Sequence, residues 1–209
     1  MTSGANAESD AGVSSANSLL SSLQRESLDA SVKQVLHRGG WGNPDVLLIE
    51  HGAEQLVVKD FAPRALWVKR LLAPFLLRRE ARAYHRLAGV PAVPRLLGQL
   101  DADALILEYR PGTLLSRALA GKLRPEFLEE LEAAIEEMHR RGVVHLDLRH
   151  RSNILAGEDG RPVLIDFASA LRFDPTKAWG RAAVAAIGWV DRRALAKWRR
   201  KLTPVVAGD

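Results

Sequence analysis

The 209-residue chain contains no cysteine, few aromatic residues (6%) and no apolar run that approaches the length of a membrane span. Without cysteine, a disulfide framework and a thiolate metal site are excluded, which is compatible with a reducing cytosol. A membrane-spanning helix needs about 18 or more consecutive apolar residues, and the N-terminus lacks the basic and apolar regions of a signal peptide. The sequence therefore predicts a cytoplasmic globular protein that is long enough to bury a substantial core.

The excess of positive charge lies in the body of the chain. The formal net charge is +5, but residues 1–30 hold only one of the 30 basic residues and four of the 25 acidic ones, which leaves about +8 on the remainder. A basic body suits an anionic partner such as a nucleotide, a nucleic acid or an anionic membrane, and a solvated basic surface accounts for it equally well. A nucleic-acid partner is not favoured, because the chain has no recognised nucleic-acid-binding motif and no aromatic-rich strand face.

Residues 143–168, VVHLDLRHRSNILAGEDGRPVLIDFA, carry two acids and an amide at the ends of short apolar runs. Asp147 lies in a polar, basic loop that ends at Asn153, and Asp166 directly follows an aliphatic run. The segment GEDGRP at residues 157–162 predicts a tight turn that joins the flanking runs as a hairpin. Phosphoryl transfer needs such a set, because one carboxylate orients the attacking hydroxyl while other oxygen ligands hold Mg²⁺. The alternative is two unrelated surface acids beside a hairpin.

These motifs resemble the catalytic half of the protein-kinase-like superfamily. His145-Leu146-Asp147 is similar to the H-x-D of its catalytic loop, Asn153 to its metal-binding asparagine and Asp166-Phe167-Ala168 to its D-F-G. The resemblance implies Asp147 as the base, Asn153 and Asp166 as magnesium ligands, Arg149 as the cation on the transferred phosphate, and ATP as the donor. The nearest likeness is to compact bacterial lipopolysaccharide core kinases, which act on Kdo or heptose, and to RIO-like kinases. Aminoglycoside phosphotransferases are less similar.

Two positions depart from the superfamily pattern. Asp147 and Asn153 are six residues apart, where five is usual, so the loop carries an extra residue or another residue takes the role of the asparagine. Ala168 replaces the usual glycine, which argues against a freely flipping D-F-G segment. His145 is either a core histidine that holds the loop or a catalytic base, and the resemblance favours the structural role.

The first half of the chain has the element order of a kinase N-terminal lobe. Strands are predicted at residues 32–36, 46–49, 55–59, 96–100 and 104–109. Between the first two strands lie three glycines that would let backbone N–H groups approach phosphate oxygens: Gly39, Gly40 and Gly42. An ordinary hairpin turn fits this segment as well.

The resemblance assigns four further nucleotide-binding residues. Lys59, at the end of the third strand, would contact the α- and β-phosphates, and Glu80 would pair with it from a helical segment that is broken near Pro74. The backbone of Glu108 and Tyr109 would bind the adenine edge, in a segment similar to the hinge between kinase lobes.

The remaining sequence predicts a small helical lobe. Residues 125–141 form the clearest helix, with Pro125 in its first turn and Gly142 as its stop. Only 41 residues follow Ala168, which leaves room for two helices at about 176–188 and 191–202, the second capped by Asp191. The predicted fold is α+β and two-lobed. A disordered or weakly helical tail (residues 1–30) precedes a protein-kinase-like domain (31–205), with a small antiparallel-sheet N-lobe (about 31–109) and a reduced helical C-lobe (about 110–205).

The predicted function is ATP- and Mg²⁺-dependent transfer of the γ-phosphate to a hydroxyl of a sugar, a lipid-linked sugar or a protein serine or threonine. The rival interpretation is a pseudokinase, a catalytically weak nucleotide-binding or interaction module. The longer spacing from Asp147 to Asn153 and the irregular glycine segment support this rival. Four retained residues oppose it: Lys59, Glu80, Asp147 and Asp166.

The last two predicted helices combine tryptophans with basic residues. Residues 179–190 are nearly apolar, and residues 192–201 hold six basic residues next to four apolar ones: Ala194, Leu195, Trp198 and Leu202. One interpretation is that both helices complete the core of the C-lobe, with a solvated basic face. The other is an anionic membrane surface as partner, with the protein peripheral at the inner face of the cytoplasmic membrane.

Overall fold

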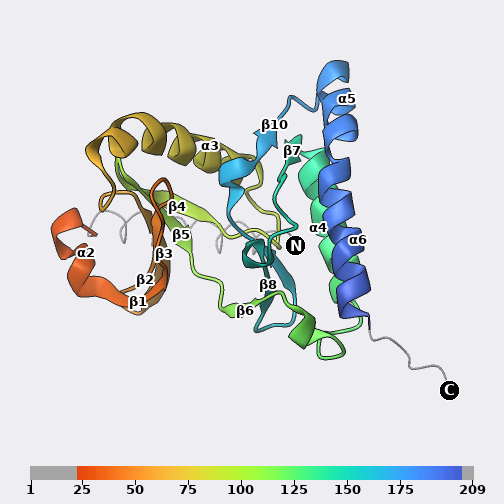
Figure 1. Cartoon of the computed structure of the whole chain (residues 1–209), viewed down its shortest axis with the longest axis horizontal. Coiled ribbons are helices and arrows are strands. Elements are labelled where there is room, and N and C mark those ends of the chain that lie inside the picture. Colours follow the sequence, from red (N-terminus) through yellow and green to blue (C-terminus); the bar gives the residue numbers. More distant parts are fainter. Residues whose placement is uncertain (1–22, 204–209) are drawn as a thin grey trace, which may run out of the picture. The chain divides into compact units, whose positions relative to one another are not determined.

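The structure, a computed structural model, describes residues 23–203, which divide into two compact units. The N-terminal unit comprises the chain up to Leu77 together with Arg95–Tyr109, and the C-terminal unit comprises Arg78–Pro94 and the chain from Arg110 onward. Figure 1 labels the elements of both units. Residues 1–22 of the predicted tail (residues 1–30) lie outside the described residues.

The N-terminal unit is built on an antiparallel sheet in the order β1-β2-β3-β5-β4. Its strands are β1 (Val32–His37), β2 (Asp45–His51), β3 (Glu54–Asp60), β4 (Leu96–Asp101) and β5 (Ala104–Glu108). Alternate residues such as Leu56 and Val58 of β3 are buried, as expected for strands whose side chains alternate between the two faces of a sheet. All five strands predicted from the sequence are confirmed.

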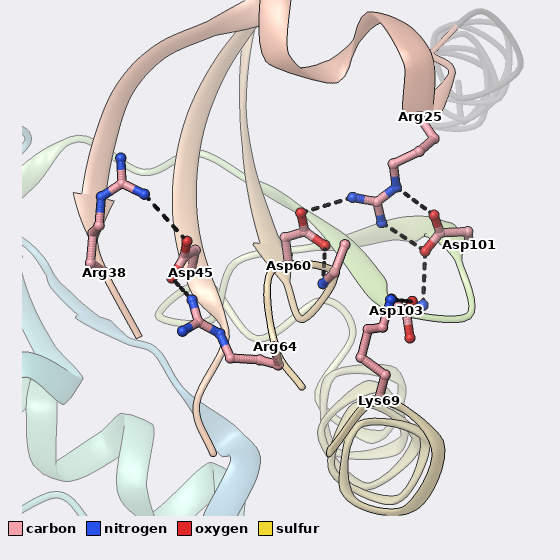
Figure 2. A network of polar contacts seen from close by, with 9 residues as sticks. Arg25, Arg38, Asp45, Asp60, Arg64, Lys69, Asp101 and Asp103 are labelled. Atoms are coloured by element: carbon pink, nitrogen blue, oxygen red, sulfur yellow. Dashed lines mark hydrogen bonds and ion pairs between the residues drawn. The ribbon is translucent and has the colours of Figure 1, made fainter. Parts of the chain in front are cut away.

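Helix α2 (Arg25–Ser31) packs on this sheet and belongs to the N-terminal unit. Leu23 and Leu28 lie in one buried cluster with sheet residues such as Ile49. The Arg25 guanidinium reaches two strands, because Nη1 donates to Asp60 at 2.8 Å and Nε donates to Asp101 at 2.6 Å (Figure 2). The described end of the predicted tail is therefore fixed by both apolar burial and ion pairs.

A single π-helical turn precedes the long helix of the chain's first half. The turn η1 (Val68–Leu72) leads directly into α3 (Ala73–Arg86), and this change from π- to α-helix is the break expected near Pro74. Pro74, the second residue of α3, follows the π-helical turn and has no backbone N–H to donate to it, which accounts for the departure from regular α-helix at this point.

The C-terminal unit combines three helices with short strands. Its helices are α4 (Phe127–Arg140), α5 (Ala178–Ile187) and α6 (Trp189–Leu202). One sheet has the order β6-β8-β9 and a second pairs β10 with β7. The strands are β6 (Gly112–Leu114), β7 (Val143–Val144), β8 (Ile154–Gly157), β9 (Pro162–Leu164) and β10 (Leu171–Arg172). The antiparallel pairing of β8 with β9 confirms the predicted hairpin.

Helices α4 and α6 lie side by side and form the core of this unit (Figure 1). The apolar stripe of α4 is buried, and so are the four apolar residues predicted on α6: Ala194, Leu195, Trp198 and Leu202. This burial confirms that α6 completes the core, and it leaves those four residues unable to face a bilayer. No helix within residues 23–203 is long and apolar enough to span a membrane. The two units together confirm the α+β class, with a small antiparallel sheet and few helices.

Candidate active site

The loop between β7 and β8 brings Asp147 and Asn153 into direct contact. Asn153 is only 2% exposed, and its Nδ2 donates to both Asp147 Oδ2 and the Asp147 carbonyl oxygen, each at 2.9 Å. Two backbone hydrogen bonds, from His150 N to Asp147 O and from Asn153 N to His150 O, fold the intervening chain into two successive turns. The winding takes up the extra residue, so the six-residue spacing still brings the carboxylate and the amide together.

Asp166 follows β9 and is tied to the same loop through its neighbour. Ile165 N donates to the Asn153 carbonyl oxygen at 3.1 Å, which holds the start of the Asp166-Phe167 segment beside the Asp147–Asn153 pair. Asp166 has φ = 66° and Leu146 has φ = 71°, and they are the two non-glycine residues with positive φ within residues 23–203. Such strained backbone is retained where surrounding contacts enforce it, and it is common in active sites.

His145 acts as a buried support for these segments. Its Nε2 lies 3.0 Å from the Ile165 carbonyl oxygen and its Nδ1 accepts a 3.4 Å bond from Asp147 N, which fits the neutral tautomer with the proton on Nε2. Full burial lowers the pKa of His145 below its usual value. The ring lies 4.7 Å from that of Phe167, which meets Tyr84 edge-on at 5.0 Å. These contacts support the structural interpretation of His145 over the catalytic base.

Asp191 is the main site residue that the sequence did not reveal as functional. It lies in the first turn of α6 with 0% exposure, and its carboxylate binds backbone N–H groups at the start of the β7–β8 loop rather than those of its own helix. Its Oδ2 accepts His145 N at 2.8 Å and lies 2.9 Å from His139 Nε2, while its Oδ1 accepts Leu146 N at 2.9 Å. The sequence gives one hint of this role, because Asp191 is the only acidic residue within residues 175–208.

The same helix also fixes the residues that follow Asp147. Trp198 Nε1 donates to the Leu148 carbonyl oxygen at 2.9 Å, and Lys197 Nζ donates to the Arg149 carbonyl oxygen. The Arg149 side chain is exposed and has no hydrogen-bond or ion-pair partner within residues 23–203. Helix α6 therefore sets the backbone on which Asp147 and Arg149 are presented.

In the N-terminal unit, the glycine segment is held by an ion pair that the sequence did not reveal. Gly39 N donates to Asp45 Oδ1 at 2.8 Å, and Arg64 Nη1 donates to the Gly39 carbonyl oxygen at 3.0 Å. Arg64 also pairs with Asp45, which is buried (Figure 2). A Cβ on Gly39 would overlap the carbonyl oxygens of Asn43 and Pro44, whereas a Cβ on Gly40 or Gly42 would meet nothing within 4 Å.

The remaining predicted nucleotide-binding residues lie in ordered positions. Lys59 is buried on β3 in the N-terminal unit, and Glu80 is buried on α3 in the C-terminal unit. Glu108 ends β5, and its backbone N–H donates to the Arg95 carbonyl oxygen at 2.9 Å, so this N–H is already used within the sheet. Tyr109 follows it and is half-buried. The residues predicted for proton transfer and metal binding, by contrast, all belong to the C-terminal unit.

The donor set at the loop fits a hard divalent cation bound together with phosphates. Within the described residues no group of three or more His, Cys, Asp or Glu is arranged to hold a metal ion. The predicted ligands are one carboxylate and one amide oxygen, which is the sparse set that Mg²⁺ uses when phosphates and waters complete its shell. Asn153 Nδ2 is turned to Asp147, so Oδ1 is the atom that would bind the ion, and among residues 23–203 only Ser152 Oγ donates to it, at 2.9 Å. The residues present therefore fit the implied ion.

Comparison with known proteins gives one family match and several relatives. Residues 33–141 match the phosphotransferase enzyme family, a match that ends before the Asp147 loop. A probable SapB synthase from Streptomyces coelicolor is 30% identical over 191 residues, which cover 79% of this chain and 20% of that protein. A serine/threonine-protein kinase C from Synechocystis is 31% identical over 150 residues, covering 64% and 28%. The human hormonally up-regulated neu tumor-associated kinase is 31% identical over 147 residues, covering 66% and 18%. The chain thus spans less than a third of the length of each relative.

Proposed function

The chain belongs to the phosphotransferase enzyme family, and we propose from this premise that it transfers the γ-phosphate of ATP to a hydroxyl group with the help of Mg²⁺. Membership confirms the predicted resemblance to the protein-kinase-like superfamily and the predicted enzyme class, a phosphotransferase with an alcohol group as acceptor. The particular closeness to lipopolysaccharide core kinases and RIO-like kinases stays a prediction.

The observation that carries the proposal is the contact between Asp147 and Asn153. Asn153 Nδ2 holds Asp147 Oδ2, and Asp147 Oδ1 has no hydrogen-bond partner within residues 23–203. The Asp147 carboxylate is exposed, so Oδ1 is available to accept the proton of an acceptor hydroxyl. As that proton moves to Asp147, the hydroxyl oxygen attacks the γ-phosphorus and the bond to the ADP oxygen breaks.

Asn153 and Asp166 would hold Mg²⁺ on the phosphates. The ion, when bound, neutralises charge that develops on the phosphate oxygens. The backbone hydrogen bond from Ile165 N to the Asn153 carbonyl oxygen joins the segments that carry the two residues, which supports this assignment. The two ends of the Asn153 amide would thus serve two roles. Nδ2 would orient Asp147, and Oδ1 would bind the metal.

The other predicted residues are proposed to bind and orient ATP. Lys59 would contact the α- and β-phosphates with Glu80 as its partner, and the loop of Gly39, Gly40 and Gly42 would place its backbone N–H groups near the phosphates. Arg149 is supported by its exposed, unpaired guanidinium two residues after Asp147. The backbone of Glu108 and Tyr109 is proposed to face the adenine edge, with the Glu108 N–H donating to the Arg95 carbonyl oxygen.

The acceptor is proposed to be a sugar, a lipid-linked sugar or a protein serine or threonine in the cytosol. Relatives named serine/threonine-protein kinases support a protein hydroxyl, and the resemblance of the motifs supports a sugar. A turnover assay with radiolabelled ATP and one acceptor of each class tests the proposal. Label should enter at least one class in the presence of Mg²⁺, and label in none of them would contradict it.

A pseudokinase remains the rival function, but one of the two sequence features that favoured it is now accounted for. The six-residue spacing no longer supports it, because the loop brings Asn153 onto Asp147. A thermal-shift assay with ATP, with and without Mg²⁺, followed by the turnover assay, separates the two. A pseudokinase binds the nucleotide and transfers nothing.

We expect Asp166→Ala to abolish the strengthening of ATP binding by Mg²⁺, because it removes the charged ligand. The affinity for Mg²⁺–ATP should fall by about tenfold or more, measured by titration calorimetry with and without the ion. Asn153→Ala removes a neutral ligand and should lose less. Glu158→Ala is the matched control, an exposed acid on the same hairpin that should bind like the unmodified chain. An equal Mg²⁺ effect in Asp166→Ala and in the control would remove Asp166 from the site.

We expect Gly39→Ala to weaken ATP binding several-fold, because its Cβ would push the backbone away from Asn43 and Pro44 and break the bonds to Asp45 and Arg64. Gly40→Ala, in the same loop, is the comparison for conformation, since a Cβ there meets no protein atom within 4 Å and should disturb the segment less. ATP titrations on both variants give the comparison, with circular dichroism to show that each is folded. If the two variants bind ATP equally, the conformation of this segment does not contribute to nucleotide binding.

A further inference from the structure

The segment before and at the start of α3 has both buried and exposed apolar side chains. Val68, Ala73 and Leu77 are buried, with 1% exposure or less. Four large apolar side chains of the same segment are exposed to solvent: Leu66 (58% exposed), Trp67 (40%), Leu71 (70%) and Phe75 (61%). Trp67, Leu71 and Phe75 are four residues apart, a spacing that places them on one side of a helix. Single exposed apolar residues are ordinary, but several of them on one side of a helix indicate a surface that another molecule covers.

A fifth residue extends this row from the glycine segment. Trp41 is 76% exposed, and its ring lies 4.6 Å from the ring of Trp67 with an interplanar angle of 53°. Both tryptophans belong to the N-terminal unit, and so do the four residues above. Trp41, Leu66, Trp67, Leu71 and Phe75 are called the apolar ridge below.

The chain around the ridge carries charge of one sign. Residues 61–79 contain five basic residues and no acidic one. Arg64 and Lys69 form ion pairs within the unit, with Asp45 and Asp103 respectively (Figure 2). Arg70 is exposed, lies directly before Leu71 and has no ion-pair or hydrogen-bond partner within residues 23–203. The surface that covers the ridge must therefore accept apolar side chains next to positive charge.

We propose that the apolar ridge docks the protein onto the surface of an anionic lipid bilayer. Tryptophan rings favour the membrane–water interface, and leucine and phenylalanine insert below it while neighbouring arginines meet anionic head groups. A second copy of the chain fits less well, because a symmetric contact would bring the two unpaired Arg70 side chains and the same basic segments together. The site differs from the α6 surface considered from the sequence, whose four apolar residues Ala194, Leu195, Trp198 and Leu202 are buried.

The test is co-sedimentation of the full chain with vesicles of phosphatidylcholine alone or of phosphatidylcholine mixed with phosphatidylglycerol. We expect binding to the anionic vesicles, little binding to the neutral ones, and release as salt is raised. Leu71→Glu and Phe75→Glu should each lower the partition coefficient about tenfold or more, since each removes one inserted side chain and adds a repelled charge. Arg70→Gln should reduce the dependence on salt.

The matched control is Trp179→Glu, which adds the same charge at an equally exposed aromatic residue (60%) of the C-terminal unit. It should bind the anionic vesicles like the unmodified chain, and thermal melting should show that all variants are folded. Equal losses in the control and in the ridge variants would overturn the proposal. So would equal binding to both vesicle types or binding to neither. If Leu71→Glu instead converts a dimer to a monomer in sedimentation velocity, the ridge is a contact between copies and the bilayer assignment is wrong.

Discussion

Asp191→Ala should lower the free energy of unfolding by about 3–5 kcal/mol. The carboxylate is fully buried and accepts the backbone N–H groups of His145 and Leu146, and His139 Nε2 lies within bonding distance. Alanine leaves all three groups without a partner in a place that water does not reach. The positive φ of Leu146 is also no longer enforced, so the loop should relax and displace Asp147.

Urea unfolding and a turnover assay on the same preparations test this prediction. Asp191→Asn keeps one acceptor oxygen in the same volume, so it should lose less stability than alanine but still lose turnover. Asp159→Ala is the control, because Asp159 is an exposed acid in the β8–β9 turn and should change neither quantity by much. An Asp191→Ala variant as stable and as active as the unmodified chain would show that the carboxylate does not hold the loop.

Asp147→Asn should reduce turnover by about 10²–10⁴-fold, the usual contribution of a general base. The substituted amide oxygen can still accept the bond from Asn153 Nδ2, so the loop keeps its conformation and the nucleotide still binds. Stopped-time assays of phosphate transfer measure the rate, and calorimetry measures ATP affinity. Asp159→Asn serves as a charge-matched control. Unchanged turnover in Asp147→Asn would assign the base to another residue.

Much of the fold could be predicted because its signals are local. The strands of the N-terminal unit were predictable from short apolar, β-branched runs such as Leu56-Val57-Val58, and the β8–β9 hairpin from the turn residues GEDGRP. Helix α4 follows from its 3.6-residue apolar period, its acidic first turn and Gly142 beyond its end. Each of these signals acts within about ten residues of chain.

The parts that could not be predicted depend on contacts between distant residues. Asp191 has the sequence pattern of a helix cap, and only the packing of α6 on α4 brings it to the backbone of His145, 46 positions away. The spacing of Asp147 and Asn153 was ambiguous because the winding of the loop is not encoded in their separation. Likewise, the apolar residues of α6 and those of the ridge look alike in sequence, and burial alone distinguishes Trp198 from Trp67.

The most direct test of the account is the transfer of label from γ-radiolabelled ATP, comparing the unmodified chain with Asp147→Asn at equal nucleotide occupancy. The account predicts that the unmodified chain labels a sugar, a lipid-linked sugar or a serine-containing peptide only when Mg²⁺ is present, and that Asp147→Asn binds ATP but labels the same acceptor at least about 100-fold more slowly. Binding of Mg²⁺–ATP by the unmodified chain without label in any acceptor, or equal labelling by the two proteins, would contradict it.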